Sequence, residues 1–374
     1  MRYILRDSSV ITSNNSLELL YKMEKFPVFI GTTNNPKEED LFEDMNWYIC
    51  KESGVIQLNK LLPLEIIYAS YHSEAVGGVW KEHHLSFIQY INKYSNKNIL
   101  EIGGSNGFIA KEFISQNLNK KWTMIEPNPK FLGNKDIKVI KGFFNKNFIC
   151  NDINTIVHSH VIEHMYNPRE FLNDVNNFLQ EDQVHIFSVP NLKKYLEQKF
   201  TNTINFEHTF FLTEELLDYL LSIYKFEIIE KKYFGDHSIF YATKKNSALQ
   251  PIKLINHYHE YKNIYISFIT FYQNEVKKLN NLIDNFDGKI YLFGAHIFSQ
   301  FLIYLGLKIE KIEMILDNSE IKTNQRLYGT NIFVNLPKSI EGLKNIAIIL
   351  KAGQYQEEIK EQLQILNTNC EIWE

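Results

Sequence analysis

Apolar and polar positions follow two different periods along the middle of the chain, residues 98–245. Short apolar runs, typical of buried strands, alternate with stretches in which apolar residues recur every three or four positions, as in helices. The predicted strands are 98–102, 122–126, 154–159, 183–189, 225–234 and 238–243, and the predicted helices include 108–117 and 169–180. This order predicts a parallel sheet with helices on both sides and an antiparallel pair of strands at one edge.

The regions on either side of this alternation have patterns of their own. A polar joint at 244–251 precedes a long helical stretch at 252–284. Further along, the predicted strands are 289–295, 312–317 and 345–350, and the predicted helices are 296–305 and 354–365. Residues 1–95 contain short apolar runs and a strand-like segment at 47–58. We therefore predict an α/β protein with a small mixed domain at 1–95, a central Rossmann-like domain at 96–245 and a small Rossmann-like α/β domain at 246–374.

Composition narrows the class of protein. The 374 residues are 44% hydrophobic and 22% charged, which suits a folded chain of more than one domain. The net charge of -4 gives no sign of the basic surface that nucleic acid requires, so a small-molecule substrate is expected. No apolar run is long enough for a membrane span or a signal core, which predicts a cytoplasmic protein. The three cysteines, Cys50, Cys150 and Cys370, lie too far apart in sequence to suggest a disulfide framework.

The segment "NILEIGGSNG" at 98–107 has the form of a nucleotide-binding turn. A short apolar strand containing Glu101 runs into five turn residues, which are Gly103, Gly104, Ser105, Asn106 and Gly107. The G-x-G-x-x-G spacing of dinucleotide sites fails from either starting glycine, so NAD is disfavoured. No Walker loop occurs anywhere in the chain, which removes the main support for ATP chemistry.

A second acid favours S-adenosylmethionine (SAM), a nucleoside cofactor without phosphates. Glu126 ends the next predicted strand, 23 residues after Gly103, and is followed by Pro127. A carboxylate at this position can accept hydrogen bonds from both ribose hydroxyls. The turn and the acid together therefore predict a SAM site.

The segment "HSHVIEHMYNP" at 158–168 has two interpretations. His160, Glu163 and His164 form the pattern H-x-x-E-H, which on one helix would bind zinc with the glutamate as base of a hydrolase. However, the pattern follows an apolar strand directly and ends at Asn167-Pro168, which leaves little room for a helix. The favoured interpretation is a loop that closes over the cofactor, with His160 and Glu163 in contact with it and no metal bound.

Four segments in this order, "NILEIGGSNG", "MIEPNP", "HSHVIEHMYNP" and "FSVPN", resemble class I SAM-dependent methyltransferases. The resemblance extends to "FEHTFFLT" at 206–213, "YLFGAHIFSQFLIYLGL" and "MILDNSEIKTNQRLYGTNIFV". With these segments the whole chain resembles the three-domain C-methyltransferases that act on nucleotide-linked keto-deoxysugars. The resemblance implies SAM as cofactor and a nucleotide-linked sugar as substrate.

The chain departs from this family in the N-terminal domain. The family binds structural zinc there through two C-x-x-C pairs. At the expected second pair this sequence has Cys50 and Ser53, and at the first it has Leu5 and Ser8. Because one thiolate cannot replace four ligands, we predict that the domain keeps its shape without zinc.

The resemblance also implies the catalytic residues. The family's glutamate-histidine pair, whose histidine is proposed to deprotonate the carbon beside the sugar ketone, matches Glu207 and His208. Asn205 stands where a tyrosine is common, and Tyr71 matches another tyrosine near the sugar. Independently of the family, an imidazole beside a carboxylate suits a general base near neutral pH. The alternative is a histidine that only packs among its phenylalanine neighbours, as in a cofactor-binding regulatory protein.

The acceptor atom is left open by these residues. Carbon methylation needs donors that stabilise an enolate oxygen, whereas a hydroxyl acceptor needs only to lose its proton. Without a tyrosine at position 205 the sequence favours O-methylation, although the Asn205 amide can also donate and keeps C-methylation as the alternative. A second glycine turn at 293–295, followed by Asp317, predicts a lobe on the substrate side or a purely structural one. The sequence does not predict an oligomeric state.

Overall fold

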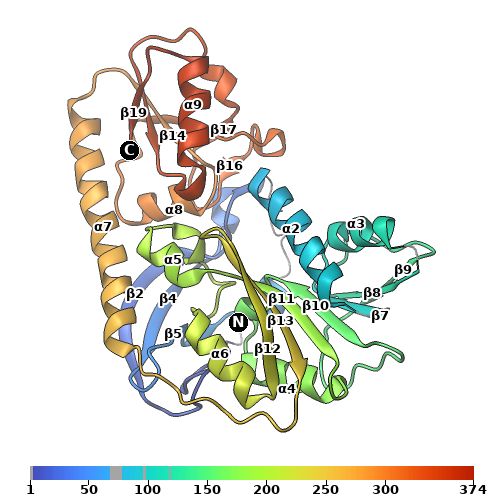
Figure 1. The fold of residues 1–374 in the computed structure, drawn as a ribbon. Helices are drawn as coiled ribbons and strands as arrows, with labels where there is room; N and C mark the ends of the chain where they lie inside the picture. The colour runs from blue at the N-terminus through green and yellow to red at the C-terminus, as the bar shows by residue number, and fades with distance from the viewer. Residues whose placement is uncertain (1–2, 68–77, 96–97, 118) are drawn as a thin grey trace.

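The computed structural model describes residues 3–67, 78–95, 98–117 and 119–374, and in them three larger β-sheets carry the architecture (Figure 1). The largest sheet has seven strands in the order β12-β13-β11-β10-β7-β8-β9. Their bounds are β7 Asn98–Ile102, β8 Lys121–Glu126, β9 Ile137–Lys141, β10 Thr155–Ser159, β11 Val184–Pro190, β12 Phe226–Phe234 and β13 Ser238–Lys245. The α/β fold class is confirmed.

The pairing of these strands agrees with the prediction from the alternating pattern. Strands β7 to β11 pair in parallel, and β13 runs antiparallel to both β11 and β12. Strand β9 was not predicted, because it is short and has only one fully buried residue, Ile137. The strand order reverses between β7 and β10, and ligands of such sheets bind outside the carboxyl ends of the strands at this point.

Helices cover both faces of the seven-stranded sheet because its central strands are apolar on both sides. The helices of this region are α2 Gly78–Tyr94, α3 Phe108–Gln116, α4 Pro168–Phe178, α5 Leu192–Glu197 and α6 Glu214–Ile223. Successive residues of β10, Ile156 and Val157, belong to two different hydrophobic clusters, one on each face. Helix α2 packs on this sheet with α3, although its residues fall in the range predicted for the N-terminal domain.

The N-terminal residues form a three-stranded antiparallel sheet of β2 Leu17–Pro27, β4 Phe42–Cys50 and β5 Ile56–Leu58. A two-stranded pair of β1 Ile4–Leu5 and β6 Lys60–Leu61 and the short helix α1 Leu64–Ile67 complete this part. The strand-like segment predicted at 47–58 is divided by a turn at Gly54, whose φ is +83°. A Cβ on Gly54 would lie 2.6 Å from the backbone of His257, so glycine permits this close approach.

The residues around Cys50 differ from the predicted positions. Leu5 and Ser8 were assigned to the first pair, and this is wrong because Leu5 is 72% exposed in β1. The side chains that face the Cys50 thiol are hydroxyls: Thr12 and Ser16 lie 3.9 and 3.4 Å from its sulfur. Burial raises the pKa of Cys50, but hydrogen bonds with Ser16, Ser53 and Ser9 outweigh it and lower the pKa to about 7. One thiol among hydroxyls does not fit a structural zinc site.

The C-terminal residues form a five-stranded parallel sheet in the order β17-β15-β14-β18-β19. Its elements are β14 Lys289–Phe293, α8 Ile297–Tyr304, β15 Ile312–Leu316, β17 Val334–Asn335, β18 Ile346–Leu350, α9 Gln356–Leu366 and β19 Glu371–Trp373. The long helix α7 Tyr258–Asn285 runs beside the N-terminal strands and up to this lobe (Figure 1). None of the helices in the described residues is long and apolar enough to cross a membrane.

Aromatic side chains of α7 pack against neighbouring elements. Tyr261, Tyr265, Phe268 and Tyr272 are all buried. The ring of Phe268 stacks on Phe301 of α8 with a centroid distance of 5.7 Å. The division of the chain into three domains stays a prediction, since all three regions contribute to one continuous hydrophobic cluster.

Candidate active site

The glycine-rich turn follows β7 beside the point where the strand order reverses. Its backbone enters the left-handed region at Gly103, Ser105 and Gly107, with φ of 77°, 45° and 70°. A Cβ built on Gly104 would lie 2.3 Å from the sulfur of Met124, which is fully buried. Any side chain at position 104 therefore displaces the turn or the core beneath it.

We expect Gly104→Ala to weaken SAM binding by about tenfold or more. Overfilling a packed site costs about 1–3 kcal/mol, and a displaced turn loses its fit to the cofactor. Isothermal titration calorimetry of both proteins measures the change. Gly78→Ala is the matched control, because nothing lies within 4 Å of a Cβ added there. An unchanged dissociation constant in Gly104→Ala would place the cofactor elsewhere.

Glu126 lies at the carboxyl end of β8 with its carboxylate held by backbone donors. Its Oε2 accepts a hydrogen bond from the Ser105 N–H at 3.2 Å, and its Oε1 accepts one from the Asn128 N–H at 2.9 Å. The carboxylate is thus fixed between the glycine turn and the segment that begins at Pro127. A half-buried carboxylate beside a glycine turn at a strand-order reversal fits the ribose of the predicted cofactor.

Glu101 points into the sheet. Its side chain is 2% exposed, and its Oε2 accepts a hydrogen bond from Trp122 Nε1 at 2.9 Å. Burial raises the pKa of Glu101 to about 7, against the smaller lowering by Trp122. In the turn, Asn106 Oδ1 accepts a hydrogen bond from the Phe108 N–H at 2.9 Å and so starts α3. Glu101 and Asn106 support the turn, and their direct contact with the cofactor stays a prediction, as does that of Pro127.

The loop after β10 is not the helix that a zinc hydrolase requires. His160 has φ of 52°, and the residues Ile162–His164 form only a 3₁₀ turn. The structure places His160 in one histidine cluster and His164 in another, so the alternative in which both bind one zinc ion with Glu163 as base is wrong. The loop packs against the glycine turn, since a Cβ on Gly103 would lie 2.7 Å from Val161.

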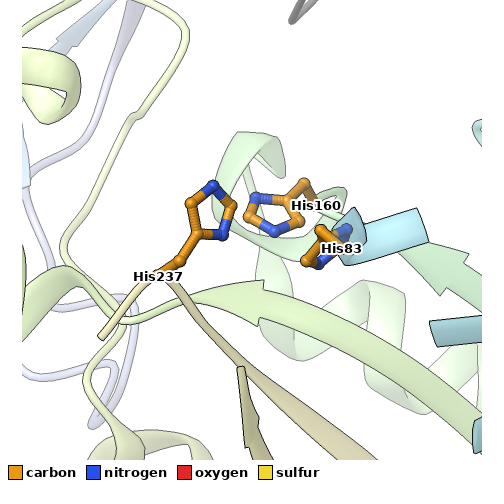
Figure 2. A group of neighbouring side chains, drawn as sticks. All are labelled: His83, His160 and His237. Atoms are coloured by element: carbon orange, nitrogen blue, oxygen red, sulfur yellow. The ribbon is translucent and has the colours of Figure 1, made fainter. Parts of the chain in front are cut away.

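The first cluster consists of His83, His160 and His237, and we refer to it as the three-histidine cluster. Figure 2 shows the three rings side by side, from α2, the loop after β10 and the turn between β12 and β13. One ring nitrogen of each lies within 4.8 Å of those of the other two. Burial lowers the pKa of each imidazole, to about 3 for His160 and His237, so all three are neutral at pH 7.

The second cluster consists of Glu163, His164 and His208, again with ligand atoms within 4.8 Å. Glu163 Oε1 lies 4.0 Å from His164 Nε2 and 3.4 Å from Nδ1 of His160, so this carboxylate connects the two clusters. Among the described residues neither oxygen of Glu163 has a hydrogen-bond partner. Burial raises the pKa of Glu163 to about 7, although the charge of His164 lowers it.

The predicted base, His208, is oriented by Asn205. Asn205 Oδ1 accepts hydrogen bonds from the backbone N–H groups of Glu207 and His208 at 2.9 and 2.7 Å. This fixes the amide, whose Nδ2 donates to the Asn202 carbonyl at 2.9 Å and lies 3.4 Å from His208 Nδ1. An amide donor at Nδ1 favours the tautomer in which that nitrogen carries the lone pair.

A buried arginine joins the base segment to the loop after β10. Arg6 donates to the Thr209 carbonyl at 2.9 Å and to the Tyr166 carbonyl at 2.6 Å. The Thr209 carbonyl also accepts a hydrogen bond from the Leu58 N–H of β5 at 2.9 Å. The N-terminal sheet thus holds His208 next to the loop that carries Glu163 and His164.

Several histidines near the site were not predicted from the sequence. His83 is buried in α2 next to the half-buried His84, and two adjacent histidines in an otherwise amphipathic helix are a signal of a polar site. His296, at the second glycine turn, is half-buried; its desolvation lowers its pKa to about 4 together with the charge of Lys322, while the charges of Asp317 and Glu207 raise it. Tyr71 lies outside the described residues.

Residues 79–231 match the family model described as a methyltransferase domain. The match spans the glycine turn, Glu126, both histidines of the H-x-x-E-H pattern and the Glu207-His208 pair. It confirms the predicted class: this region is a class I SAM-dependent methyltransferase domain, and the protein is an enzyme with SAM as its cofactor. A comparison with curated proteins finds no match.

Two solved structures similar to the chain are methyltransferases that align with less than half of it. N-methyltransferase NodS from Bradyrhizobium japonicum WM9 has 13% identity and a TM-score of 0.35, covering 45% of this chain and 97% of that chain. Human N-acetylserotonin methyltransferase in complex with SAM has 17% identity and a TM-score of 0.40, covering 45% of this chain and 53% of that chain. The substrates of such distant proteins do not define the acceptor of this one.

Proposed function

We propose that the protein transfers the methyl group of SAM to a hydroxyl group of a nucleotide-activated sugar, with His208 as general base. The nucleotide-sugar acceptor rests on the resemblance of the whole chain to the three-domain sugar methyltransferases. The proposal of a hydroxyl acceptor rests on the hydrogen bonds of Asn205, the residue at the family's tyrosine position.

The amide of Asn205 is already engaged. Its oxygen accepts two backbone hydrogen bonds, and its NH₂ group donates to Asn202 and faces His208. In place of the family's tyrosine, which could donate to the enolate oxygen of carbon methylation, stands an amide whose NH₂ group is directed at Asn202 and His208. A hydroxyl acceptor needs no such donor, so the geometry of Asn205 favours O-methylation.

His208 would accept the hydroxyl proton at Nδ1. The contact of 3.4 Å with Asn205 Nδ2 is long, so an acceptor hydroxyl can replace the amide at this nitrogen. SAM supplies an electrophilic methyl group, and the turn, Glu126 and the loop after β10 hold the reactants in line and exclude water. His164, whose ring centroid lies 4.8 Å from that of His208, packs beside the base.

We further propose the three predicted domains, with the C-terminal lobe on the substrate side. Helix α8 contacts the 3₁₀ turn Thr201–Thr203, just before Asn205. At the start of α8, His296 lies close enough to Glu207 for that carboxylate to influence its pKa. The lobe thus reaches the base segment, where a sugar acceptor and its nucleotide would lie between the two parts.

The pH dependence of kcat/KM tests the base. Burial, together with the charges of His164 and His160, lowers the pKa of His208 well below its usual value. The neutral imidazole is the active form. We therefore expect kcat/KM to stay constant as the pH falls to about 6.5, the ordinary pKa of histidine, and to decline only at lower pH. An acid limb centred at or above that value would contradict the assignment.

The proposal is tested with labelled SAM and a panel of nucleotide sugars, half of them carrying a 4-keto group. We expect label in hydroxyl sugars and an O-methyl signal in the product by NMR. Transfer only to keto sugars with a new C–C bond would replace O-methylation by C-methylation. Binding of SAM with no transfer to any sugar would overturn the substrate class.

A further inference from the structure

The three-histidine cluster has the composition of a metal site. Neither ring nitrogen of His83 has a hydrogen-bond partner among the described residues, and Nε2 of His237 has none either. His83 is 0% and His237 5% exposed, so these nitrogens are also shielded from solvent. Buried imidazole nitrogens without partners are costly, and a metal ion is the ligand that satisfies several neutral imidazoles at once.

The partners of the other ring nitrogens prepare two histidines for metal binding. His237 Nδ1 lies 2.5 Å from Ser238 Oγ, and in the tautomer in which Nδ1 donates to this hydroxyl the lone pair is on Nε2. His160 Nδ1 lies 3.4 Å from Glu163 Oε1 without a hydrogen bond between them, so a small approach would form the carboxylate–histidine arrangement that supports metal ligands. The Ser238 hydroxyl also lies 3.0 Å from His160 Nε2, and rotation of its proton frees that nitrogen.

The surroundings of the three-histidine cluster match those of a metal centre. The indole ring of Trp80 lies with its centroid 4.9 and 4.7 Å from those of His160 and His237 and covers the cluster with an apolar wall. Two nitrogen ligands of a tetrahedral ion stand about 3.4 Å apart, so the ring nitrogens, now within 4.8 Å of one another, would need to approach by at most about 1.4 Å.

We propose that His83, His160 and His237 bind one divalent late transition-metal ion, of which Zn²⁺ and Co²⁺ are the practical probes. Three neutral imidazoles suit this group of ions and disfavour Mg²⁺ and Ca²⁺, which prefer oxygen ligands. Three protein ligands leave a fourth position for water or for an oxygen of a substrate, as in catalytic rather than structural sites. The cluster adjoins the glycine turn through Val161, so this position lies near the cofactor site. The inference replaces the expectation of a metal-free protein and does not depend on the proposed acceptor.

The test uses the full chain, stripped with a chelator and dialysed against Zn²⁺ or Co²⁺. We expect one ion per chain by mass spectrometry of the metal and a visible Co²⁺ spectrum typical of tetrahedral coordination. His83→Ala and His237→Ala should each weaken binding by more than about tenfold. His237→Cys keeps a ligand and should retain the ion with an added thiolate–Co²⁺ absorption band, which separates ligand loss from misfolding.

Two variants locate the ion. His208→Ala tests the cluster with Glu163 and His164, and Cys50→Ser tests the N-terminal domain. Both should bind the ion as the unchanged protein does. Loss of the ion in either variant, or no stoichiometric ion in the unchanged protein, would overturn the proposal. SAM binding is measured on the same metal-free sample. If SAM binds there, a failure of the metal proposal leaves the methyltransferase function intact.

Discussion

Replacing His208 with alanine is expected to lower kcat for methyl transfer by about 10²–10⁴-fold, the usual contribution of a general base. The affinity for SAM should stay the same, because the glycine turn after β7 and Glu126 at the end of β8 belong to other segments than the one that carries His208. Single-turnover assays with labelled SAM measure the chemical step, and calorimetry measures the affinity. The loss should be in kcat more than in KM, since the base acts on the acceptor proton and not on binding.

The matched control for this prediction is His259→Ala, a histidine exposed on α7. It should leave both kcat and SAM affinity unchanged. If His208→Ala methylates its acceptor as fast as the control does, the histidine only packs in the loop. The base would then have to be sought in Glu163 or His164, which share its cluster.

Replacing Asp40 with alanine is expected to lower the free energy of unfolding by about 3–5 kcal/mol. The Asp40 carboxylate accepts two hydrogen bonds from Arg326, at 2.6 and 2.7 Å, and one from the Gly329 N–H at 2.8 Å. The side chains are only 7% and 1% exposed for Arg326 and Asp40. Removing the acid leaves a buried guanidinium without its counter-charge, and urea denaturation measures the loss.

This ion pair ties the N-terminal region to the C-terminal lobe, where β3 Thr32–Thr33 also pairs with β16 Arg326–Leu327. Lys289→Ala is the control, because Lys289 and Glu313 form an ion pair that is 57% and 45% exposed. An exposed pair contributes about 0–1 kcal/mol. The double variant Asp40→Leu/Arg326→Met should be more stable than Asp40→Ala, since it leaves no unpaired charge. Equal stability of Asp40→Ala and Lys289→Ala would show that the buried pair is not needed.

Much of the fold follows from local pattern. Strands β7, β8 and β10 to β13 and helices α3 and α4 were predicted within a few residues because buried strands and amphipathic helices have distinct periods. Strand β9 and the N-terminal strand β2 were missed. β2 is 11 residues long but mostly half-exposed, and two register shifts interrupt its pairing with β4 and hence its alternation. The packing of helix α2 on the central sheet was not predicted, because the spacing of apolar residues does not show which element a helix packs against.

The site divides in the same way. The glycine turn and Glu126 were recognisable because a cofactor turn is a continuous segment with a fixed strand before it. The residue that orients His208 was not recognisable from the sequence. Adjacency suggested Glu207, whereas the structure places the Asn205 amide at Nδ1 of His208. Likewise Leu5 and Ser8 were wrongly expected opposite Cys50, since only the tertiary structure shows that the hydroxyls of Thr12 and Ser16 face this thiol.

The sequence by itself determined the class of the protein, a SAM-dependent methyltransferase on an α/β sheet, because strand period, glycine spacing and the terminal acid are local properties of the chain. Only the tertiary structure decided which histidines act together. It separates His160 from His164, four residues away, and joins it to His83 and His237, which come from a helix and a hairpin far along the chain. Such convergence depends on how sheets and helices pack, and no local pattern records it.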